Sequence, residues 1–209
     1  MGVRFGAAMF NGNSNSMDNT SRQTVDVLNL KKDDVLDLTK GLEQVVLAAG
    51  WDISKNGASF DLDIAAFMLD EYGRVKNVST DVIYFNNKVG QGILLEGDNL
   101  TGSGDGDDER IQVDLKKIPA GKEKIVFIVT IHEAALKKQT FGMIDNSYVR
   151  LLNAAAGDEE ICRFNLKEDG STATSVIFAE LYKSNKNWKF KAIGDGRVGD
   201  LNDILRLYL

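Results

Sequence analysis

The residues best suited to chemistry lie between Lys88 and Arg110, a stretch that contains six carboxylates and no basic residue. Within it, four glycines are interleaved with acidic and small polar residues from Gly97 to Glu109. Glycine lets the backbone adopt positive φ and turn its carbonyl oxygens inward. Ca²⁺ takes six to eight oxygen ligands at about 2.3–2.6 Å from carboxylates, carbonyls and water. The spacing therefore predicts a calcium-binding loop, because mutual repulsion of so many carboxylates is relieved by a divalent cation.

The segment does not match two better-known loop types. Asp98 to Glu109 spans twelve positions, as an EF-hand loop does, but Leu100, Gly102 and Ser103 occupy positions where that loop requires Asp, Asn or Gly. It also leads into a strand-like run and not into a helix. A phosphate-binding loop is disfavoured because the segment contains no Lys or Arg. A solvated acidic turn is the plainer alternative, but it does not need glycines at such regular intervals.

A second acidic pair supports a shared ion. In the run from Phe60 to Ile64, period two places Asp61 and Asp63 on one face of a strand, opposite the apolar residues. Two carboxylates on one strand face are unfavourable in isolation. A solvated outer face is the alternative interpretation of this pair. With the acidic loop in the same chain we interpret the pair as further ligands, and Asp52 as a turn residue.

The chain offers no convincing catalytic constellation. His132 is the only histidine, so a two-histidine metal site within one chain is excluded, and no nucleophile motif accompanies it. We interpret His132 as a structural hydrogen-bonding residue. Cys162 is the only cysteine, which excludes a disulfide framework, indicates a reducing compartment and is typical of an inert buried thiol. We therefore expect a protein that is not an enzyme.

Strands must position these residues. Arg110–Leu115 alternates polar and apolar residues, which predicts a half-buried strand, and Lys124–Ile131 is almost continuously apolar, which predicts a strand buried on both faces. Helical patterns are confined to His132–Lys138 and to the tail after Asp200, a candidate N-cap. Further strand-like runs are Gln44–Ala49, Phe60–Leu69, Asp81–Asn86, Tyr148–Leu152, Ile161–Leu166, Ser175–Tyr182 and Trp188–Ile193. The expected fold is mainly β, an antiparallel β-sandwich with short peripheral helices, including one at the C-terminus.

Length and charge limit the other possibilities. We expect residues 1–24, rich in Asn, Ser and Gly, to form a flexible arm, and residues 25–209 to form a single domain. The net charge of −6 equals the six acids of the loop region, so the remainder is balanced and has no basic stripe for nucleic acid. No apolar run predicts a transmembrane segment, and the first residues do not resemble a secretory signal. These features predict a cytoplasmic protein.

Several of these motifs together resemble the TerD family of tellurium-resistance and general stress proteins. The strongest matches are Gly50-Trp51-Asp52, Phe60-Asp61-Leu62-Asp63 and the run from Gly97 to Glu109. Weaker matches are Lys124-Ile125-Val126-Phe127, His132-Glu133-Ala134, Phe141-Gly142, Glu180-Leu181-Tyr182 and Trp188-Lys189-Phe190. The resemblance covers Val25 to the carboxyl terminus, and the acidic-loop motif is its most specific part.

The resemblance implies a cytoplasmic or loosely membrane-associated β-sandwich that binds one or two Ca²⁺ ions. It implies a non-enzymatic scaffold or sensor in stress response and tellurite resistance, with protein partners in a resistance complex. Two alternatives stay open: a metal-dependent phosphoester hydrolase using Mg²⁺ or Mn²⁺, and a receptor for a small ligand such as a cyclic nucleotide. The implied metal ligands are Asp61, Asp63, Asp98, Asn99, Thr101, Gly102, Gly104, Asp107, Asp108 and Glu109.

Overall fold

A computed structural model provides the structure of the protein. It describes residues 28–29, 31–38, 42–52, 60–97, 106–144, 146–166 and 172–209. The expected arm over residues 1–24 lies outside the described residues, and so does most of the acidic loop, from 98 to 105. The end of that loop and both halves of the second acidic pair are described.

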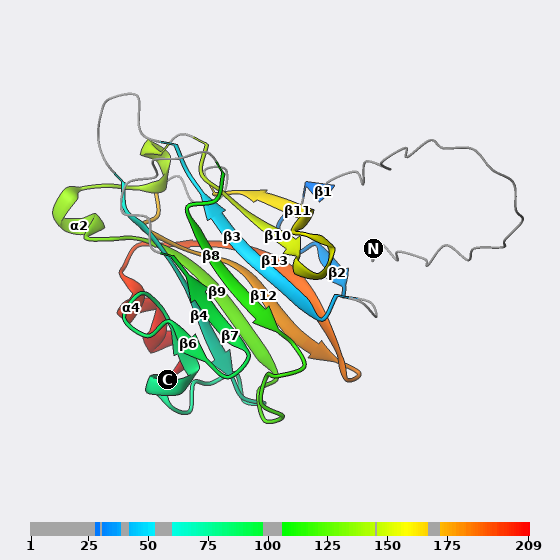
Figure 1. Ribbon diagram of the computed structural model, residues 1–209. Coiled ribbons are helices and arrows are strands. Elements are labelled where there is room, and N and C mark those ends of the chain that lie inside the picture. Colours follow the sequence, from blue (N-terminus) through cyan, green and yellow to red (C-terminus); the bar gives the residue numbers. More distant parts are fainter. Residues whose placement is uncertain are drawn as a thin grey trace, which may run out of the picture.

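The described strands form two sheets that pack face to face (Figure 1). In the first sheet the strand order is β1 (Leu28–Asn29), β11 (Glu159–Asn165), β10 (Tyr148–Asn153), β3 (Gln44–Gly50), β8 (Glu109–Asp114), β7 (Ile93–Glu96) and β6 (Val89–Gly90). In the second it is β2 (Val35–Asp37), β13 (Asn187–Arg197), β12 (Ser175–Ser184), β9 (Lys124–Ile131), β4 (Leu62–Leu69) and β5 (Val82–Ile83). The described pairs are antiparallel except for β1 with β11, which is parallel. The expected antiparallel sandwich is therefore confirmed.

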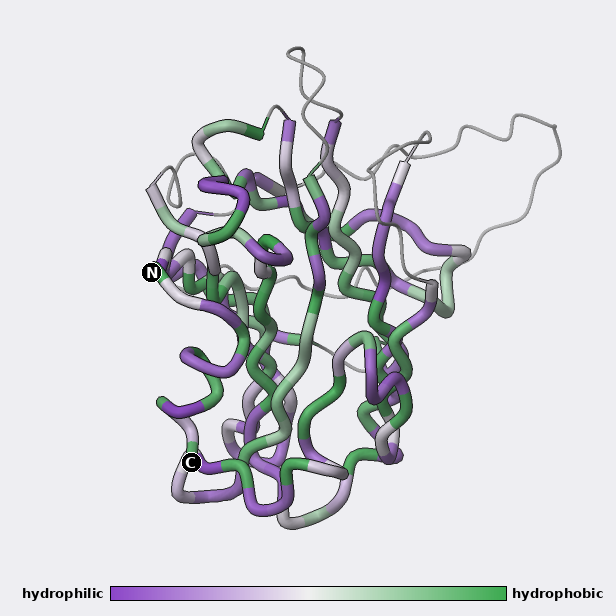
Figure 2. Tube along the Cα trace, turned by 90° about the vertical axis from the view of Figure 1, so that its left-hand side faces the viewer, coloured by the Kyte–Doolittle hydropathy of each residue, from purple (hydrophilic) through white to green (hydrophobic). Residues whose placement is uncertain are grey.

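The main hydrophobic core lies between the two sheets. Alternate residues of β3, β8 and β10 meet alternate residues of β4, β9 and β12 there, and Phe127 and Phe178 are among the largest side chains of that core. Figure 2 shows the hydrophobic residues running along the strands while the connecting turns are mostly hydrophilic. Strand β9 is buried on both faces over most of its length, as its continuous apolar sequence predicts.

The C-terminal helix covers the outer face of the second sheet. Asp200 caps α4 (Leu201–Leu205), and its side chain forms a reciprocal capping box with Asp203. Ile204 packs into a second apolar cluster with Phe67, whose ring lies 5.9 Å from that of Tyr208. Burial raises the pKa of the Tyr208 hydroxyl to about 12. The expected C-terminal helix and its N-cap are both confirmed.

Other local predictions were met in part. The expected helix at His132–Lys138 is α2 (Ala134–Lys137), a single turn. The strand expected over Asp81–Asn86 is wrong at its start, because α1 (Val78–Asp81) is capped by the Asn77 side chain and leaves only β5 beyond it. Local side-chain capping there prevails over the strand preference of the following apolar residues. The β12–β13 hairpin turns at Asn185 and Lys186, whose φ angles are 52° and 66°.

Candidate functional site

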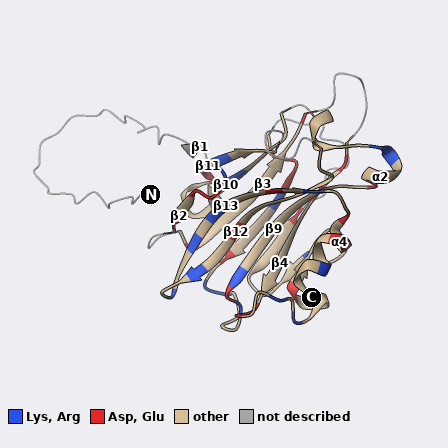
Figure 3. Cartoon of the chain, turned by 180° about the vertical axis from the view of Figure 1, so that it is seen from behind, with Lys and Arg blue, Asp and Glu red and all other residues tan. Residues whose placement is uncertain are grey.

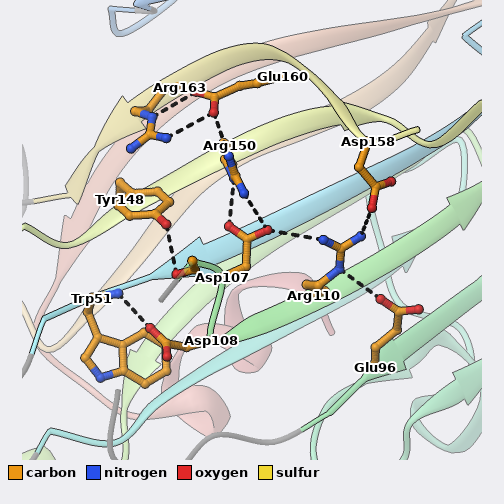
Figure 4. Close-up of polar contacts among 11 residues, drawn as sticks. Trp51, Glu96, Asp107, Asp108, Arg110, Tyr148, Arg150, Asp158, Glu160 and Arg163 are labelled. Atoms are coloured by element: carbon orange, nitrogen blue, oxygen red, sulfur yellow. Dashed lines mark hydrogen bonds and ion pairs between the residues drawn. The ribbon is translucent and has the colours of Figure 1, made fainter. Parts of the chain in front are cut away.

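Three consecutive acidic residues at the end of the acidic loop point in three different directions. Asp107 lies on the outer face of the first sheet, and the Asp108 side chain bonds to Trp51, just after β3 (Figure 4). Glu109 begins β8 with its side chain toward the core. The alternation of β8 explains Glu109 and Arg110, since successive side chains of a strand point to opposite faces. Because the three side chains point apart, each of them contacts a different part of the protein.

Asp107 is held by two arginines. Its Oδ1 and Oδ2 accept hydrogen bonds from Arg150 Nε and Nη2 at 2.7 and 2.9 Å, and Arg110 Nη1 donates to Oδ2 at 3.2 Å. The Asp107 side chain is only 3% exposed. Bidentate pairs of this kind fix a carboxylate strongly in position. The structure thus places Asp107 against arginine and not against the other described candidate ligands.

The two arginines belong to a row of residues that crosses the sheet. In the strand register, Arg110 on β8 pairs with Ala48 on β3, Ala48 pairs with Arg150 on β10, and Arg150 pairs with Arg163 on β11. Like charges in such a row repel one another. Acidic residues interleaved among them offset that repulsion. We call the three arginines together with their acidic partners the arginine row. The arginines are Arg110, Arg150 and Arg163, and the acidic partners are Asp107, Glu160, Asp158 and Glu96.

Each arginine of the row is paired with at least one carboxylate. The hydrogen bonds that Arg150 donates to Asp107 and, to a smaller extent, to Glu160 raise the pKa of Arg150 despite its burial. The hydrogen bond from Arg163, together with that from Arg150, holds the pKa of the Glu160 carboxyl below its usual range, although burial works in the other direction. These groups therefore stay ionised across the physiological pH range. The arginines of the row act as a fixed anchor for Asp107.

Tyr148 fastens the residue before Asp107. Its hydroxyl donates to the Gly106 carbonyl oxygen at 3.0 Å, and the Arg163 guanidinium stacks over its ring at 4.2 Å. A side chain at Gly50 would lie 2.5 Å from the Tyr148 ring and 2.9 Å from the Gly106 oxygen. Gly50 is therefore required for this close approach, which gives a physical reason for the glycine before Trp51.

Asp108 joins the loop end to the turn after β3. Its Oδ2 accepts from the Trp51 backbone N–H at 2.9 Å, and its own N–H donates to the Ala49 carbonyl at 2.8 Å. Trp51 in turn donates from its indole Nε1 to the Phe60 carbonyl at 3.1 Å. This chain of contacts links the acidic loop to the segment that contains Asp61.

The Glu109 side chain reaches from the first sheet to the second. Its side chain is 2% exposed, and its Oε2 accepts the backbone N–H of Ile64, on the opposite sheet, at 2.6 Å. Ile64 is paired along one edge of β4 with Val129, while β5 pairs with β4 only at Ala66 and Phe67. The Glu109 carboxylate therefore supplies an acceptor near the start of β4. It brings the end of the acidic loop to the strand that carries the second acidic pair.

The second acidic pair lies at this same end of β4. Asp63 is buried on the face opposite Ile64, and its Oδ2 lies 3.4 Å from His132 Nδ1. The His132 backbone N–H donates to the Asp61 carbonyl at 2.8 Å, and the Phe85 ring meets the imidazole edge-on at 6.0 Å. The sequence interpretation of His132 as a hydrogen-bonding residue agrees with these contacts.

The candidate ligands are thus only partly assembled by the residues the structure describes. Glu109 and Asp108 connect to the segment around Asp61 and Asp63, whereas Asp107 does not. Within that described part of the chain, no three His, Cys, Asp or Glu side chains come close enough together to hold a metal ion. Any calcium site must therefore draw on further oxygens. The remaining candidates, Asp98, Asn99, Thr101, Gly102 and Gly104, lie outside the described residues.

The arginine row is the feature that sequence reasoning missed. Arg110 follows the acidic run directly, and Arg150 and Arg163 occupy polar positions of their strands, but nothing local reveals that these strands align them.

Cys162, by contrast, behaves as expected, because it is 2% exposed and burial raises its pKa to about 12.

Comparisons with known proteins identify the family of this chain. The model of the TerD domain family matches residues 27–208. General stress protein 16U of Bacillus subtilis is 42% identical over 187 residues, covering 87% of this chain and 96% of that protein. Tellurium resistance protein TerD of Serratia marcescens is 41% identical over 170 residues, covering 80% of this chain and 88% of that protein.

A solved structure shows the same fold. The crystal structure of a homologue of telluride resistance protein from Streptomyces coelicolor A3(2) superposes with a TM-score of 0.66 at 23% identity, covering 79% of this chain and 96% of that one. None of the helices in the described residues is both long and apolar enough to cross a membrane.

Proposed function

This chain belongs to the TerD domain family of tellurium-resistance and general stress proteins, and from that premise we propose that it binds calcium as a cytoplasmic, non-enzymatic scaffold or sensor. The single observation that carries the proposal is the hydrogen bond from the Ile64 N–H to Glu109 Oε2, at 2.6 Å. It joins the end of the acidic loop to the start of β4, where Asp61 and Asp63 lie. Two stretches of chain that are distant in the sequence and carry candidate acidic ligands thereby lie at the same end of the sandwich.

The proposed ligands are the carboxylates of Asp61, Asp63, Asp108 and Glu109, completed by oxygens of the 98–104 segment. The donor chemistry suits Ca²⁺, which prefers hard oxygen ligands and needs six to eight of them. When bound, the ion would supply positive charge that offsets the repulsion among these carboxylates. The candidate oxygens of the 98–104 segment are Asp98, Asn99, Thr101, Gly102 and Gly104.

The arginine row has a positioning role in this proposal. By fixing Asp107, and with Tyr148 holding the Gly106 carbonyl, it sets where the loop ends and β8 begins. Asp108 and Glu109 are then presented toward Trp51 and Ile64. A loop whose end is fixed before the ion arrives loses less conformational entropy on binding. We therefore propose that Asp107 raises calcium affinity indirectly.

The same geometry supports our proposal of a calcium-dependent surface. The Asp108 carboxylate contacts the Trp51 N–H, and the Trp51 indole contacts the Phe60 carbonyl, so this region connects three separate stretches of the chain. We propose that protein partners of a stress or resistance complex bind there and that calcium controls the surface they encounter.

Calorimetric titration and thermal unfolding, with Ca²⁺ and with Mg²⁺, test the proposal. If Ca²⁺ binds only the folded form, stability should rise by about 2.7 kcal/mol at a hundredfold excess over Kd. Asp98→Asn, Asp108→Asn and Glu109→Gln should each weaken calcium binding by about tenfold or more. The matched control is Asp114→Asn, at the far end of β8, where the carboxylate pairs with Lys117 at 3.0 Å.

The outcomes separate the alternatives. Absence of binding heat, with a melting curve that does not move between chelator and millimolar Ca²⁺, would contradict the proposal. Preference for Mg²⁺ over Ca²⁺ together with turnover of a phosphoester would favour the hydrolase alternative. Equal loss of affinity in Asp114→Asn would show that total charge matters and not the specific site.

A further inference from the structure

A groove of about 550 Å³ lies on the outer side of the second sheet, between the α2 region and the start of α4. Figures 1 and 3 show α2 and α4 on the same side of the molecule. Asp63, Phe85 and His132 line it from the sheet side, and Leu136 and Val198 line it from α2 and from the connection to α4. None of the contacts described above fills this groove.

The groove exposes large apolar side chains. Leu136 is 78% exposed and Val198 is 82% exposed, although each belongs to a residue type that is usually buried. Phe85, stacked edge-on against His132, and the buried Ala134 add further apolar lining. Apolar side chains gathered around a hollow, with polar groups at its margin, are typical of a binding site.

Four of the residues that line the groove are acidic, beside neutral polar residues such as Thr130, Thr174 and Asn202. Asp63, Glu133, Asp200 and Asp203 line the groove, and none of the described residues lining it is Lys or Arg. Two neighbouring cations offset part of this charge, since Lys137 Nζ lies 3.4 Å from Glu133 and Arg206 Nη1 lies 2.5 Å from Asp203. The lining nevertheless keeps an excess of carboxylates, which complements a cationic ligand.

We propose that this groove binds a short, basic, amphipathic segment of a partner protein. Its apolar side chains would pack against Leu136 and Val198, and its Lys or Arg side chains would face Asp200 and Asp203. An apolar anchor with charged flanks matches both the hollow and its margin. The proposal does not rest on calcium binding.

The test uses a fluorescein-labelled nine-residue peptide in which Leu and Phe alternate with Lys, followed by anisotropy in the presence of EGTA. A peptide with Glu in place of every Lys is the ligand control. The basic peptide should bind and the acidic one should not. Leu136→Lys and Val198→Lys should each weaken binding about tenfold or more. Val89→Lys, at an apolar residue that is 68% exposed on β6, is the matched surface control and should bind as the wild type does.

Asp200→Ser isolates the electrostatic contribution. Serine retains the N-cap of α4 and removes the charge, so binding should weaken about two- to fivefold while the melting temperature stays near that of the wild type. Equal binding of the two peptides, or unchanged binding by both Lys variants, would overturn the proposal. So would sedimentation showing a dimer that Val198→Lys dissociates, because the face would then serve self-association. Peptide binding in EGTA by a protein that shows no calcium response would support this inference while contradicting the calcium proposal.

Discussion

Strand β4 has acidic residues at both ends, and the two ends are built differently. At its C-terminal end, Asp70 and Asp81 are fixed by nearby turns and by lysine. At its N-terminal end, Asp63 lies beside His132, and carboxylates reach in from the acidic loop. Asp108 and Glu109 find partners 57 and 45 residues away. The carboxylates at the C-terminal end are held by backbone N–H groups two to five residues away and by lysine. Asp63, Asp108 and Glu109 instead have their partners in distant stretches of the chain.

The C-terminal end carries its own cation. Asp81 Oδ2 lies 2.5 Å from Lys122 Nζ and also accepts the backbone N–H groups of Lys76 and Asn77. Asp70 accepts the N–H groups of Tyr72 and Arg74 within its own turn. This comparison indicates that acidic residues in this protein serve two purposes. At one end of β4 they complete the fold, and at the other we propose that they bind an ion.

The largest effect should come from removing the internal cation. Lys122→Met leaves the Asp81 carboxylate, with a side chain 6% exposed, without its lysine partner. Breaking a buried ion pair from one side costs about 3–5 kcal/mol. Urea unfolding at neutral pH should report a loss of this size. A loss below about 1 kcal/mol would show that the ion pair does not serve the structural role described.

The same variant has a predictable pH dependence. Burial raises the pKa of the Asp81 carboxyl, but hydrogen bonds from Lys122 and the Asn77 N–H outweigh it, so the folded-state pKa is lowered. A lowered pKa contributes stability that is present above the unfolded value of about 4 and lost as pH falls through the folded value. The stability gap between wild type and Lys122→Met should therefore be full above pH about 5 and shrink below pH about 4. A gap that is constant with pH would contradict this assignment.

The next largest effect concerns the anchor of the acidic loop. Arg150→Met removes two hydrogen bonds to Asp107 and one to Glu160. Hydrogen bonds to charged groups contribute about 1.5–3 kcal/mol, and Arg110 retains part of the attachment, so we expect a loss of about 2 kcal/mol. Chemical denaturation in chelator measures it. Calcium affinity should fall in the same variant, and unchanged affinity would show that the arginine row does not position the loop.

Glu109 separates structure from ion binding. Glu109→Leu leaves the Ile64 N–H without its carboxylate acceptor, at an expected cost of about 1–2 kcal/mol in chelator. Glu109→Gln keeps an oxygen acceptor and should lose less stability. Both variants should bind calcium weakly if Glu109 is a ligand. A Gln variant with wild-type calcium affinity would restrict Glu109 to its structural contact.

The smallest effect should come from an exposed pair. Lys116 contacts Glu43, and the side chains are 69% and 49% exposed. Pairs of this kind contribute about 0–1 kcal/mol, so Lys116→Gln should change the free energy of unfolding by no more than about 0.5 kcal/mol. A thermal melt of this variant measures the stability lost at an exposed ion pair, for comparison with the losses at the buried sites. A large loss of stability here would contradict the predicted order of effects.

Much of the fold could be predicted because its determinants are local. The continuous apolar run at Lys124–Ile131 coincides with β9, and the alternation at Arg110–Leu115 nearly coincides with β8. The N-cap at Asp200 could also be predicted from the sequence. The strand expected from Asp81 failed because the Asn77 cap and the Asp81 carboxylate stabilise a helical turn through hydrogen bonds. Periodicity does not detect such contacts.

The site was less predictable because it depends on strand order. Period two was enough to separate Asp63 from Ile64. The position of Asp107 could not be inferred, since Arg150 and Arg110 become its neighbours only when β10, β3 and β8 align in register. The Glu109 contact with Ile64 likewise requires the two sheets to face each other. Such long-range pairing is invisible in any single segment.

The most direct test of the central claim is diffraction from crystals grown in millimolar calcium. We expect density for a cation coordinated by oxygens from both acidic stretches, with Asp61 or Asp63 on one side and Asp108 or Glu109 on the other. Asp107 should remain bound to Arg150. Carboxylates from the two stretches turned apart, with no ion between them at that calcium concentration, would contradict the account.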